Sequence, residues 1–279
     1  MKFIEFLKAI LIGIVEGVTE WLPVSSTGHM ILLDELISLE VSAQFLEMFL
    51  VVIQLGAILA VPVIFWDRLY PFSKNKSAEQ RRATLSLWGK VIVGAIPAAI
   101  FGVLLDDILE EYLYGFVVVA VALVVYGVAF IVVERLNREK RFRVESVEDL
   151  TYADALRIGA FQVLSLVPGT SRSGSTILGG ILTGVSRTAS AEFSFFMAIP
   201  IMLGASGLKV LKFVVGGFTA TGAEILLLLT GIVVSFVVSV FVIRFLMDFV
   251  KRHSFSAFGV YRIVLGLVVI SYYLIKTLA

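Results

Sequence analysis

Residues 16–29 read EGVTEWLPVSSTGH and residues 162–176 read QVLSLVPGTSRSGST, within a chain that is otherwise strongly apolar. Both stretches combine charged or hydroxyl side chains with a proline and with glycines, which interrupt helices. Polar and charged side chains are costly inside a bilayer, and those found there usually have a function. We therefore expect these two polar segments to form the functional centre, and their placement decides the fold.

The composition is typical of a membrane protein. Of the 279 residues, 59% are hydrophobic and 16% are charged, and the mean hydropathy is +0.99. The apolar runs hold about twenty residues, enough to cross a hydrocarbon core of roughly 30 Å, and they do not alternate as barrel strands would. We predict an all-α polytopic membrane protein, with spans near 43–66, 89–106, 113–133, 187–213, 223–247 and 256–277.

The net charge and the cysteine count bear on which kinds of functional site the chain can contain. The net charge is only +1 and the basic residues lie between apolar runs, so nothing in the sequence indicates nucleic-acid binding. The chain has no cysteine, which excludes disulfides, thiol catalysis and cysteine metal sites.

The basic residues gather in three loops, near 68–90, 135–157 and 244–262. We assign Arg262 to the third loop, together with Lys251 and Arg252. The acidic segment 106–111 contains no basic residue. The positive-inside rule then places the three basic loops in the cytoplasm and the acidic segment outside.

This orientation predicts that the second polar segment is a re-entrant hairpin. A helix over 154–167 would be only roughly 21 Å long, too short to span comfortably. If it crossed, every later loop would change sides, whereas a hairpin entered from the cytoplasm avoids the conflict. We expect the helix after the turn to begin near Ser175 or Thr176.

The two polar segments also match each other. A shift of 146 residues aligns Gly13 with Gly159, Ser25 with Ser171 and Gly28 with Gly174. We therefore predict a first hairpin over residues 1–38, entered from the outside. Halves of approximately 1–134 and 150–279 would each hold one hairpin and three spans, forming an inverted-topology repeat in a single membrane domain, 1–279. Inverted repeats bring broken helices together near the bilayer middle, so both segments should line one wet cavity.

The second segment has the chemistry of an anion site. A turn over 170–173 that leads into a helix can direct several backbone N–H groups at one anion. Arg172 adds a permanent charge and a planar fork that matches two phosphate oxygens. The alternative is a helix break whose hydroxyls only cap backbone groups. The candidate substrate-binding hydroxyls here are Thr170, Ser171, Ser173 and Thr176.

The first segment carries a pair of acids. Glu16 and Glu20 are four residues apart, so a helix presents both carboxylates on one face. Two such carboxylates cannot both stay ionised cheaply in a partly dry cavity. A divalent cation, Mg²⁺ or Ca²⁺, would resolve the conflict. The alternative is that they lie on the surface of an interfacial helix.

His29 and the hydroxyls before it are candidates for the reacting groups. His29 could act as a general acid or base or as a nucleophile, or could simply cap or pack a helix. Ser25, Ser26 and Thr27 could supply a nucleophile or bind phosphate, and the sequence does not rank them.

A second layer of polar residues could orient the two hairpins. Glu47, Gln54 and Glu192 lie inside apolar runs, and Gln162 aligns with Glu16 in the repeat. The alternative is that the acids lie near span ends and face lipid headgroups.

Together these residues resemble the undecaprenyl-diphosphate phosphatase family of bacteria, the integral-membrane type also known as the bacitracin-resistance protein. The resemblance covers essentially the whole chain. Its motifs are EGVTE at 16–20, PVSSTGH at 23–29, PGTSRSGST at 168–176 and AEFSF at 191–195. It implies hydrolysis of undecaprenyl diphosphate to undecaprenyl phosphate and inorganic phosphate with a divalent cation, which recycles the lipid carrier of peptidoglycan synthesis. The family residues linked to activity match Glu16, Glu20, Ser26, His29 and Arg172.

The resemblance also implies a multi-pass protein of the bacterial cytoplasmic (inner) membrane, with the bilayer and a polyprenyl diphosphate lipid as its partners. The main alternative is a lipid-carrier flippase or another secondary transporter, because such proteins often use inverted repeats. The sequence leaves open the nucleophile (Ser26, His29 or water), the membrane face of the site, the lipid chain length and the oligomeric state, a homodimer included.

Overall fold

The computed structural model describes residues 3–113, 115–138 and 140–278. Within these ranges the protein is helical and has no strand, apart from an isolated β-bridge between Val144 and Val185. The elements in chain order are α1 (Phe3–Thr19), α2 (Ser26–Leu36), α3 (Ala43–Val52), α4 (Gln54–Ile64), α5 (Trp66–Leu69), α6 (Ala78–Leu113), α7 (Phe116–Leu136), η1 (Val147–Asp149), α8 (Tyr152–Val163), η2 (Leu164–Leu166), α9 (Arg172–Leu182), α10 (Arg187–Val215), α11 (Gly222–Val250) and α12 (Ser256–Leu278).

Six segments are long and apolar enough to cross a membrane: Ala43–Ile64, Ala78–Leu105, Phe116–Leu136, Arg187–Val215, Gly222–Val250 and Ser256–Thr277. The first combines α3 and α4. These segments coincide with the six runs expected from the sequence. The prediction of an all-α polytopic membrane protein is therefore confirmed.

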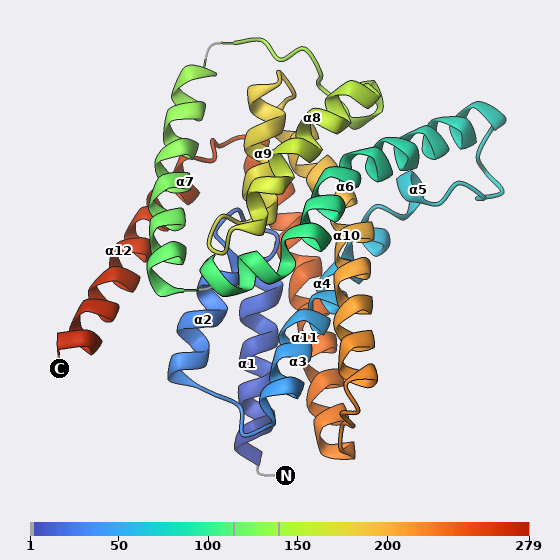
Figure 1. Cartoon of the computed structure of the whole chain (residues 1–279). Helices are drawn as coiled ribbons and strands as arrows, with labels where there is room; N and C mark the ends of the chain where they lie inside the picture. The colour runs from blue at the N-terminus through green and yellow to red at the C-terminus, as the bar shows by residue number, and fades with distance from the viewer. Residues whose placement is uncertain (1–2, 114, 139, 279) are drawn as a thin grey trace.

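The two polar segments form the turns of two helical hairpins, α1–α2 and α8–η2–α9. Figure 1 shows α1 and α2 in the lower half of the bundle and α8 and α9 in the upper half, with their turns meeting in the middle. The Ser173 hydroxyl donates a hydrogen bond across this junction to the main-chain oxygen of Glu20, 3.2 Å away. The fold therefore brings residues about 150 positions apart into contact.

Two helix boundaries in the second hairpin differ from the sequence prediction. The helix expected over 154–167 is α-helical only from Tyr152 to Val163, and a 3₁₀ turn, η2, follows it. The next helix begins at Arg172 rather than near Ser175 or Thr176. The reason is a serine cap at Ser171, which starts the helix directly after the break.

Close helix packing holds each hairpin in place. At Gly13 of α1 an added Cβ would lie 2.9 Å from the Gly231 carbonyl oxygen of α11. At Gly159 of α8 it would lie 2.1 Å from the Gly94 carbonyl oxygen of α6. Small residues at such crossings let helix backbones approach closely within a membrane. Each hairpin is thus seated against one long helix of the bundle.

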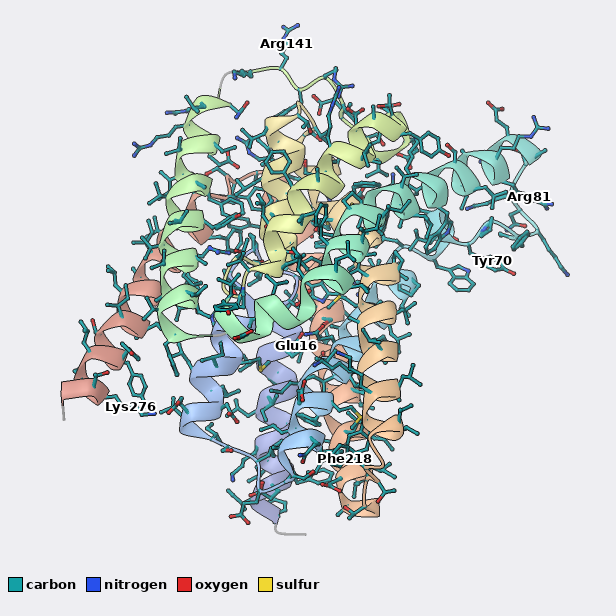
Figure 2. All side chains as sticks on the ribbon, viewed as in Figure 1. Glu16, Tyr70, Arg81, Arg141, Phe218 and Lys276 are labelled. Carbon is teal, nitrogen blue, oxygen red and sulfur yellow. The ribbon has the colours of Figure 1, made fainter. Side chains whose placement is uncertain are left out.

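Arg81, in the first turn of α6, and Arg141, in the loop after α7, lie toward one end of the bundle, and Phe218 lies at the other (Figure 2). Several basic residues expected in the loops lie inside helices instead, among them Arg81 and Lys90 in α6, Arg157 in α8 and Arg244 in α11. Arg262 lies within α12, six residues after its start, and its side chain is fully buried. Its assignment to the third basic loop was wrong, because the apolar helix already begins at Ser256.

Candidate active site

Both hairpin turns end in the same backbone conformation. Ser25 and Ser171 have φ of 74° and 76°, and no other described residue except glycine has a positive φ. Each serine side chain caps the helix that follows: Ser25 Oγ accepts from the Gly28 N–H at 3.2 Å, and Ser171 Oγ accepts from the Gly174 N–H at 3.1 Å. A left-handed conformation in a residue other than glycine costs energy and often marks a functional site. These caps make Ser26 and Arg172 the first residues of their helices.

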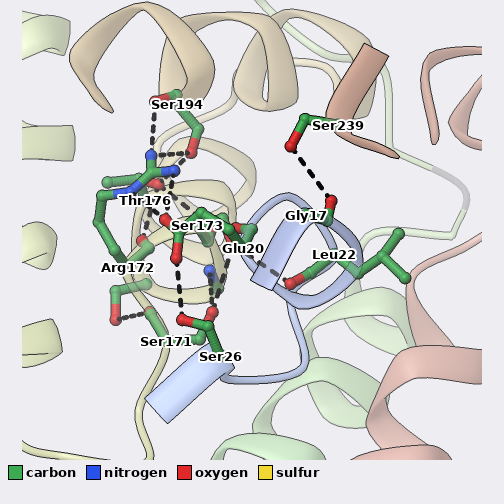
Figure 3. Close-up of polar contacts among 12 residues, drawn as sticks. Gly17, Glu20, Leu22, Ser26, Ser171, Arg172, Ser173, Thr176, Ser194 and Ser239 are labelled. Carbon is green, nitrogen blue, oxygen red and sulfur yellow. Dashed lines mark hydrogen bonds and ion pairs between the residues drawn. The ribbon is translucent and has the colours of Figure 1, made fainter. Parts of the chain in front are cut away.

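The Glu20 carboxylate links the two hairpins (Figure 3). Its Oε1 accepts from Arg172 Nη2 at 3.1 Å and from Nε at 3.3 Å. Its Oε2 accepts from the Ser26 hydroxyl at 2.8 Å. The third guanidinium nitrogen, Nη1, donates to the main-chain oxygen of Ser194 at 2.7 Å. Every nitrogen of the Arg172 fork therefore has a protein partner, and a phosphate bound here would share or replace the Glu20 contact.

This group of charges lies in dry surroundings. The side chains of Glu20 and Arg172 are 6% and 11% exposed. The Arg172 guanidinium lies 5.7 Å from the ring centroid of Trp21, which is itself buried against Phe195. Charged hydrogen bonds are stronger when water is excluded. The cluster is therefore held rigidly and would act strongly on any charge developing beside it.

Glu16 lies one helical turn before Glu20 and is buried as well, 1% exposed. Neither of its carboxylate oxygens has a hydrogen-bond partner among the described residues. Burying an unpaired carboxylate is costly, so such a group calls for a proton or a cation. No set of three or more Asp, Glu, His or Cys side chains able to hold a metal occurs in the described part of the chain. A cation at Glu16 and Glu20 would therefore need substrate oxygens or water to complete its ligands.

The His29 ring makes no hydrogen bond to the Ser26 hydroxyl and is hydrogen-bonded at both of its nitrogens. Nδ1 lies 2.7 Å from the Ser25 carbonyl oxygen, and Nε2 lies 2.6 Å from the Tyr261 hydroxyl. A carbonyl oxygen can only accept, so we assign the proton to Nδ1, and neutral His29 then accepts from Tyr261 at Nε2. The proton acceptor for Ser26 in this arrangement is Glu20, not His29.

The other predicted substrate-binding hydroxyls mostly make protein contacts. The Thr176 hydroxyl donates to Ser194 Oγ at 2.7 Å, and Ser173 bridges to the first hairpin. Thr170 is buried, and Thr27 is half-buried in the first turn of α2. Of these side chains Ser173 joins the two hairpins and Thr176 ties α9 to α10, whereas the buried Thr170 hydroxyl has no hydrogen-bond partner among the described residues. Their contact with substrate stays a prediction.

The expected second layer of polar residues divides into two groups. Gln162 is fully buried, and its side-chain amide has no partner among the described residues, as at the aligned Glu16. Gln54 is half-buried at the start of α4. In contrast, Glu47 pairs with Lys209, and Glu192 pairs with Arg68 at 2.7 Å. Both acids are thus engaged by cations outside the Glu20–Arg172 group.

Sequence reasoning missed three residues that complete the centre. Ser194 lies in the motif AEFSF, but only the fold brings it to Arg172. Tyr261 contacts His29, and Arg262 contacts both turns. The available signal for Arg262 was a single charge inside an otherwise apolar run.

Taken together, these features define a polytopic α-helical membrane protein with a buried glutamate, arginine and serine cluster where two helical hairpins meet. The family model of the bacitracin resistance protein BacA matches residues 9–268, nearly the whole chain. The chain therefore belongs to this family, which confirms the resemblance seen in its motifs.

Curated relatives match the chain along almost its full length. An undecaprenyl-diphosphatase of Enterococcus faecalis is 57% identical, covering 97% of this chain and 98% of the relative. One from Desulfitobacterium hafniense is 53% identical over 100% of this chain and 99% of the relative. A third, from Acetivibrio thermocellus, is 54% identical with 97% and 98% coverage.

Proposed function

We propose that this protein hydrolyses undecaprenyl diphosphate to undecaprenyl phosphate and inorganic phosphate. Full-length relatives named for this activity support the proposal. The structural observation that carries it is the contact of Ser26 and Arg172 with the same Glu20 carboxylate, inside an apolar bundle. The reaction regenerates the lipid carrier of cell-wall synthesis, and the family's name connects it with bacitracin resistance. The flippase or transporter alternative receives no support from these relatives.

In the proposed mechanism the Ser26 hydroxyl attacks the terminal phosphorus of the lipid diphosphate. Its proton passes to Glu20, the bond from phosphorus to the bridging oxygen breaks, and undecaprenyl phosphate leaves. Arg172 and the N–H groups of 171–173 balance the charge on the phosphoryl oxygens, whereas the Thr170 N–H is hydrogen-bonded to the Val167 carbonyl oxygen. Water then hydrolyses the phosphoserine and releases inorganic phosphate. The short contact between Ser26 and Glu20 supports this route over attack by His29 or by water.

A divalent cation, Mg²⁺ or Ca²⁺, fits the acidic side of this centre. Glu16 is a buried carboxylate without a hydrogen-bond partner among the described residues, and Glu20 lies one turn away. Such a cation would neutralise diphosphate oxygens. In the proposal the carboxylates of Glu16 and Glu20 bind the cation, and the hydrogen bond from Arg172 to Oε1 keeps the Glu20 carboxylate oriented.

The same proposal includes the inverted repeat, with halves 1–134 and 150–279. Three observations support it. The matching caps at Ser25 and Ser171 agree in φ. Helix α1 packs on α11 while the aligned α8 packs on α6. The hairpins enter the bundle from opposite ends (Figure 1).

With the basic loops in the cytoplasm, α1–α2 would enter from outside as one re-entrant hairpin and α8–α9 from the cytoplasm as the other. We place the chain in the bacterial inner membrane, with a homodimer as one candidate state.

The test is phosphate release by the purified chain in detergent, supplied with undecaprenyl diphosphate and Mg²⁺ or Ca²⁺. We expect one phosphate for each lipid phosphate formed, and loss of turnover with a chelator. A well-folded preparation that releases no phosphate with either cation would refute the enzyme proposal.

A further inference from the structure

Arg262 is a fully buried charge in a membrane-spanning helix, six residues after the helix begins. It forms no ion pair with any acidic side chain that the structure describes. A charge at such a place is costly, and one without a carboxylate partner needs another reason to be there.

The hydrogen bonds of Arg262 supply that reason. Nη1 donates to the carbonyl oxygen of Pro23 at 3.1 Å, and Nη2 donates to that of Gly169 at 2.8 Å. Pro23 lies in the first hairpin turn and Gly169 in the second. Carbonyls beyond a helix end have no helical N–H donor, and the planar guanidinium can serve two of them at once.

These two carbonyls lie close in sequence to the groups of the proposed reaction. Pro23 is three residues after Glu20 and three before Ser26, and Gly169 is three residues before Arg172. A shift of either turn relative to Arg262 would therefore move one side of the Glu20–Arg172 contact.

The second turn packs closely against α7 on one side and Arg262 on the other. Gly169 has φ of +90°, and a Cβ there would lie 2.6 Å from the Val119 carbonyl oxygen of α7. On the other side, a Cβ at Gly174 would lie 3.4 Å from Arg262 Nη1. The Arg262 guanidinium is also 5.6 Å from the ring centroid of Tyr126, which belongs to α7. The turn is thus enclosed between α7 and the Arg262 guanidinium.

We propose that Arg262 is a positioning residue: through the carbonyls of Pro23 and Gly169, it sets the distance between the turn that carries Glu20 and Ser26 and the turn that carries Arg172. It acts without touching the substrate. The proposal rests on the proposed phosphatase function, because that reaction needs Glu20 and Ser26 at a fixed distance from Arg172. A misplacement of reacting groups by about 1 Å can lower a rate about 100-fold.

Turnover tests this role with two variants and a matched control. Arg262→Met removes the hydrogen bonds to the carbonyl oxygens of Pro23 and Gly169, together with a longer one of 3.5 Å to that of Ala122 in α7. Arg262→Lys keeps the charge but replaces the two-pronged fork by a single ammonium. We expect kcat to fall about 100-fold in Arg262→Met and about tenfold in Arg262→Lys, with KM changed by less than about threefold. The control, Arg187→Met, removes a different arginine, which is partly buried and paired with Glu134. It should lower thermal stability while the folded protein keeps the parent kcat.

A distance measurement tests the proposal independently of activity. The chain has no cysteine, so nitroxide labels can be placed at Ile14→Cys on α1 and Leu156→Cys on α8, which are 39% and 49% exposed. Pulsed electron paramagnetic resonance should give one narrow distance distribution in the parent and in Arg187→Met. The distribution should broaden or shift in Arg262→Met and in Arg262→Lys.

An unchanged distribution in the folded Arg262 variants would overturn the proposal, as would a parent-like kcat. If Arg262→Met does not fold, Arg262→Lys alone decides. If the parent itself releases no phosphate, the proposed function fails, whereas the distance measurement still tests the coupling of the hairpins.

Discussion

The Ser26 hydroxyl donates to Glu20 Oε2 at 2.8 Å, and Arg172 binds the other oxygen of the same carboxylate at 3.1 Å. Glu20 can therefore accept the Ser26 proton while Arg172 keeps the carboxylate oriented. The geometry makes Glu20 the first candidate for the general base and leaves His29 with a different partner, Tyr261.

Glu20→Gln should lower kcat by about 10²–10⁴-fold, the usual contribution of a positioned base. An amide cannot take up the serine proton, although it keeps the shape of the side chain. Phosphate release from undecaprenyl diphosphate measures the effect. Glu35→Gln, at the far end of α2, removes an exposed pair with Lys276 and should leave kcat unchanged. Parent-like turnover in Glu20→Gln would assign the base elsewhere.

Ser26→Ala should abolish turnover, because the proposed intermediate is a phosphoserine. Trapping the parent with a phosphate mimic and mapping peptides by mass spectrometry should find the modification on Ser26. A modification on His29, or substantial turnover by Ser26→Ala, would instead favour histidine or water as the nucleophile.

Arg172→Ala should reduce kcat by at least about 10³-fold, in the range for an arginine that stabilises a transferring phosphoryl group. It should also destabilise the fold by about 3–5 kcal/mol, since it leaves the buried Glu20 carboxylate unpaired. The double variant Arg172→Ala with Glu20→Ala should recover much of that stability and none of the activity. Thermal denaturation in detergent separates the two effects, and equal stability of the single and double variants would contradict the buried ion pair.

Glu16→Gln should weaken cation binding while making the cation-free protein more stable. The substitution removes a buried carboxylate that lacks a hydrogen-bond partner among the described residues. The parent should gain thermal stability on titration with Mg²⁺ or Ca²⁺, because a ligand of the folded state stabilises it, and Glu16→Gln should lose most of that gain. If both proteins respond equally, the cation binds elsewhere.

Tyr261→Phe should leave kcat within about threefold of the parent, because the proposed mechanism uses Glu20 as the base and gives no step to His29. The ring of Tyr261 stacks on His29 with a centroid distance of 5.7 Å, and the variant keeps that ring while removing the hydroxyl donor. The chain has two histidines, so ¹⁵N spectra can be assigned by comparison with His253→Gln. The parent should show His29 protonated at Nδ1, and a proton on Nε2 would contradict the hydrogen-bond assignment.

The membrane class, the six spans, the two helix breaks and most residues of the centre could be predicted from the amino-acid sequence. Apolar runs and their interruptions are local properties, and the bilayer allows few ways to satisfy the backbone of such a chain. The repeat at a shift of 146 residues also located the turns, and the paired serine caps at Ser25 and Ser171 agree with it.

The pairing of the polar groups, in contrast, became visible only in the folded protein. The Ser26 hydroxyl hydrogen-bonds to Glu20 rather than to His29. Arg172 pairs with Glu20 in the protein without substrate, whereas the sequence indicated a phosphate as its partner. Arg262 belongs to the centre and not to a loop. Such contacts depend on how α12 and the two hairpins pack, and hydrogen-bond geometry within a few tenths of an ångström cannot be read from the spacing of residues along a chain.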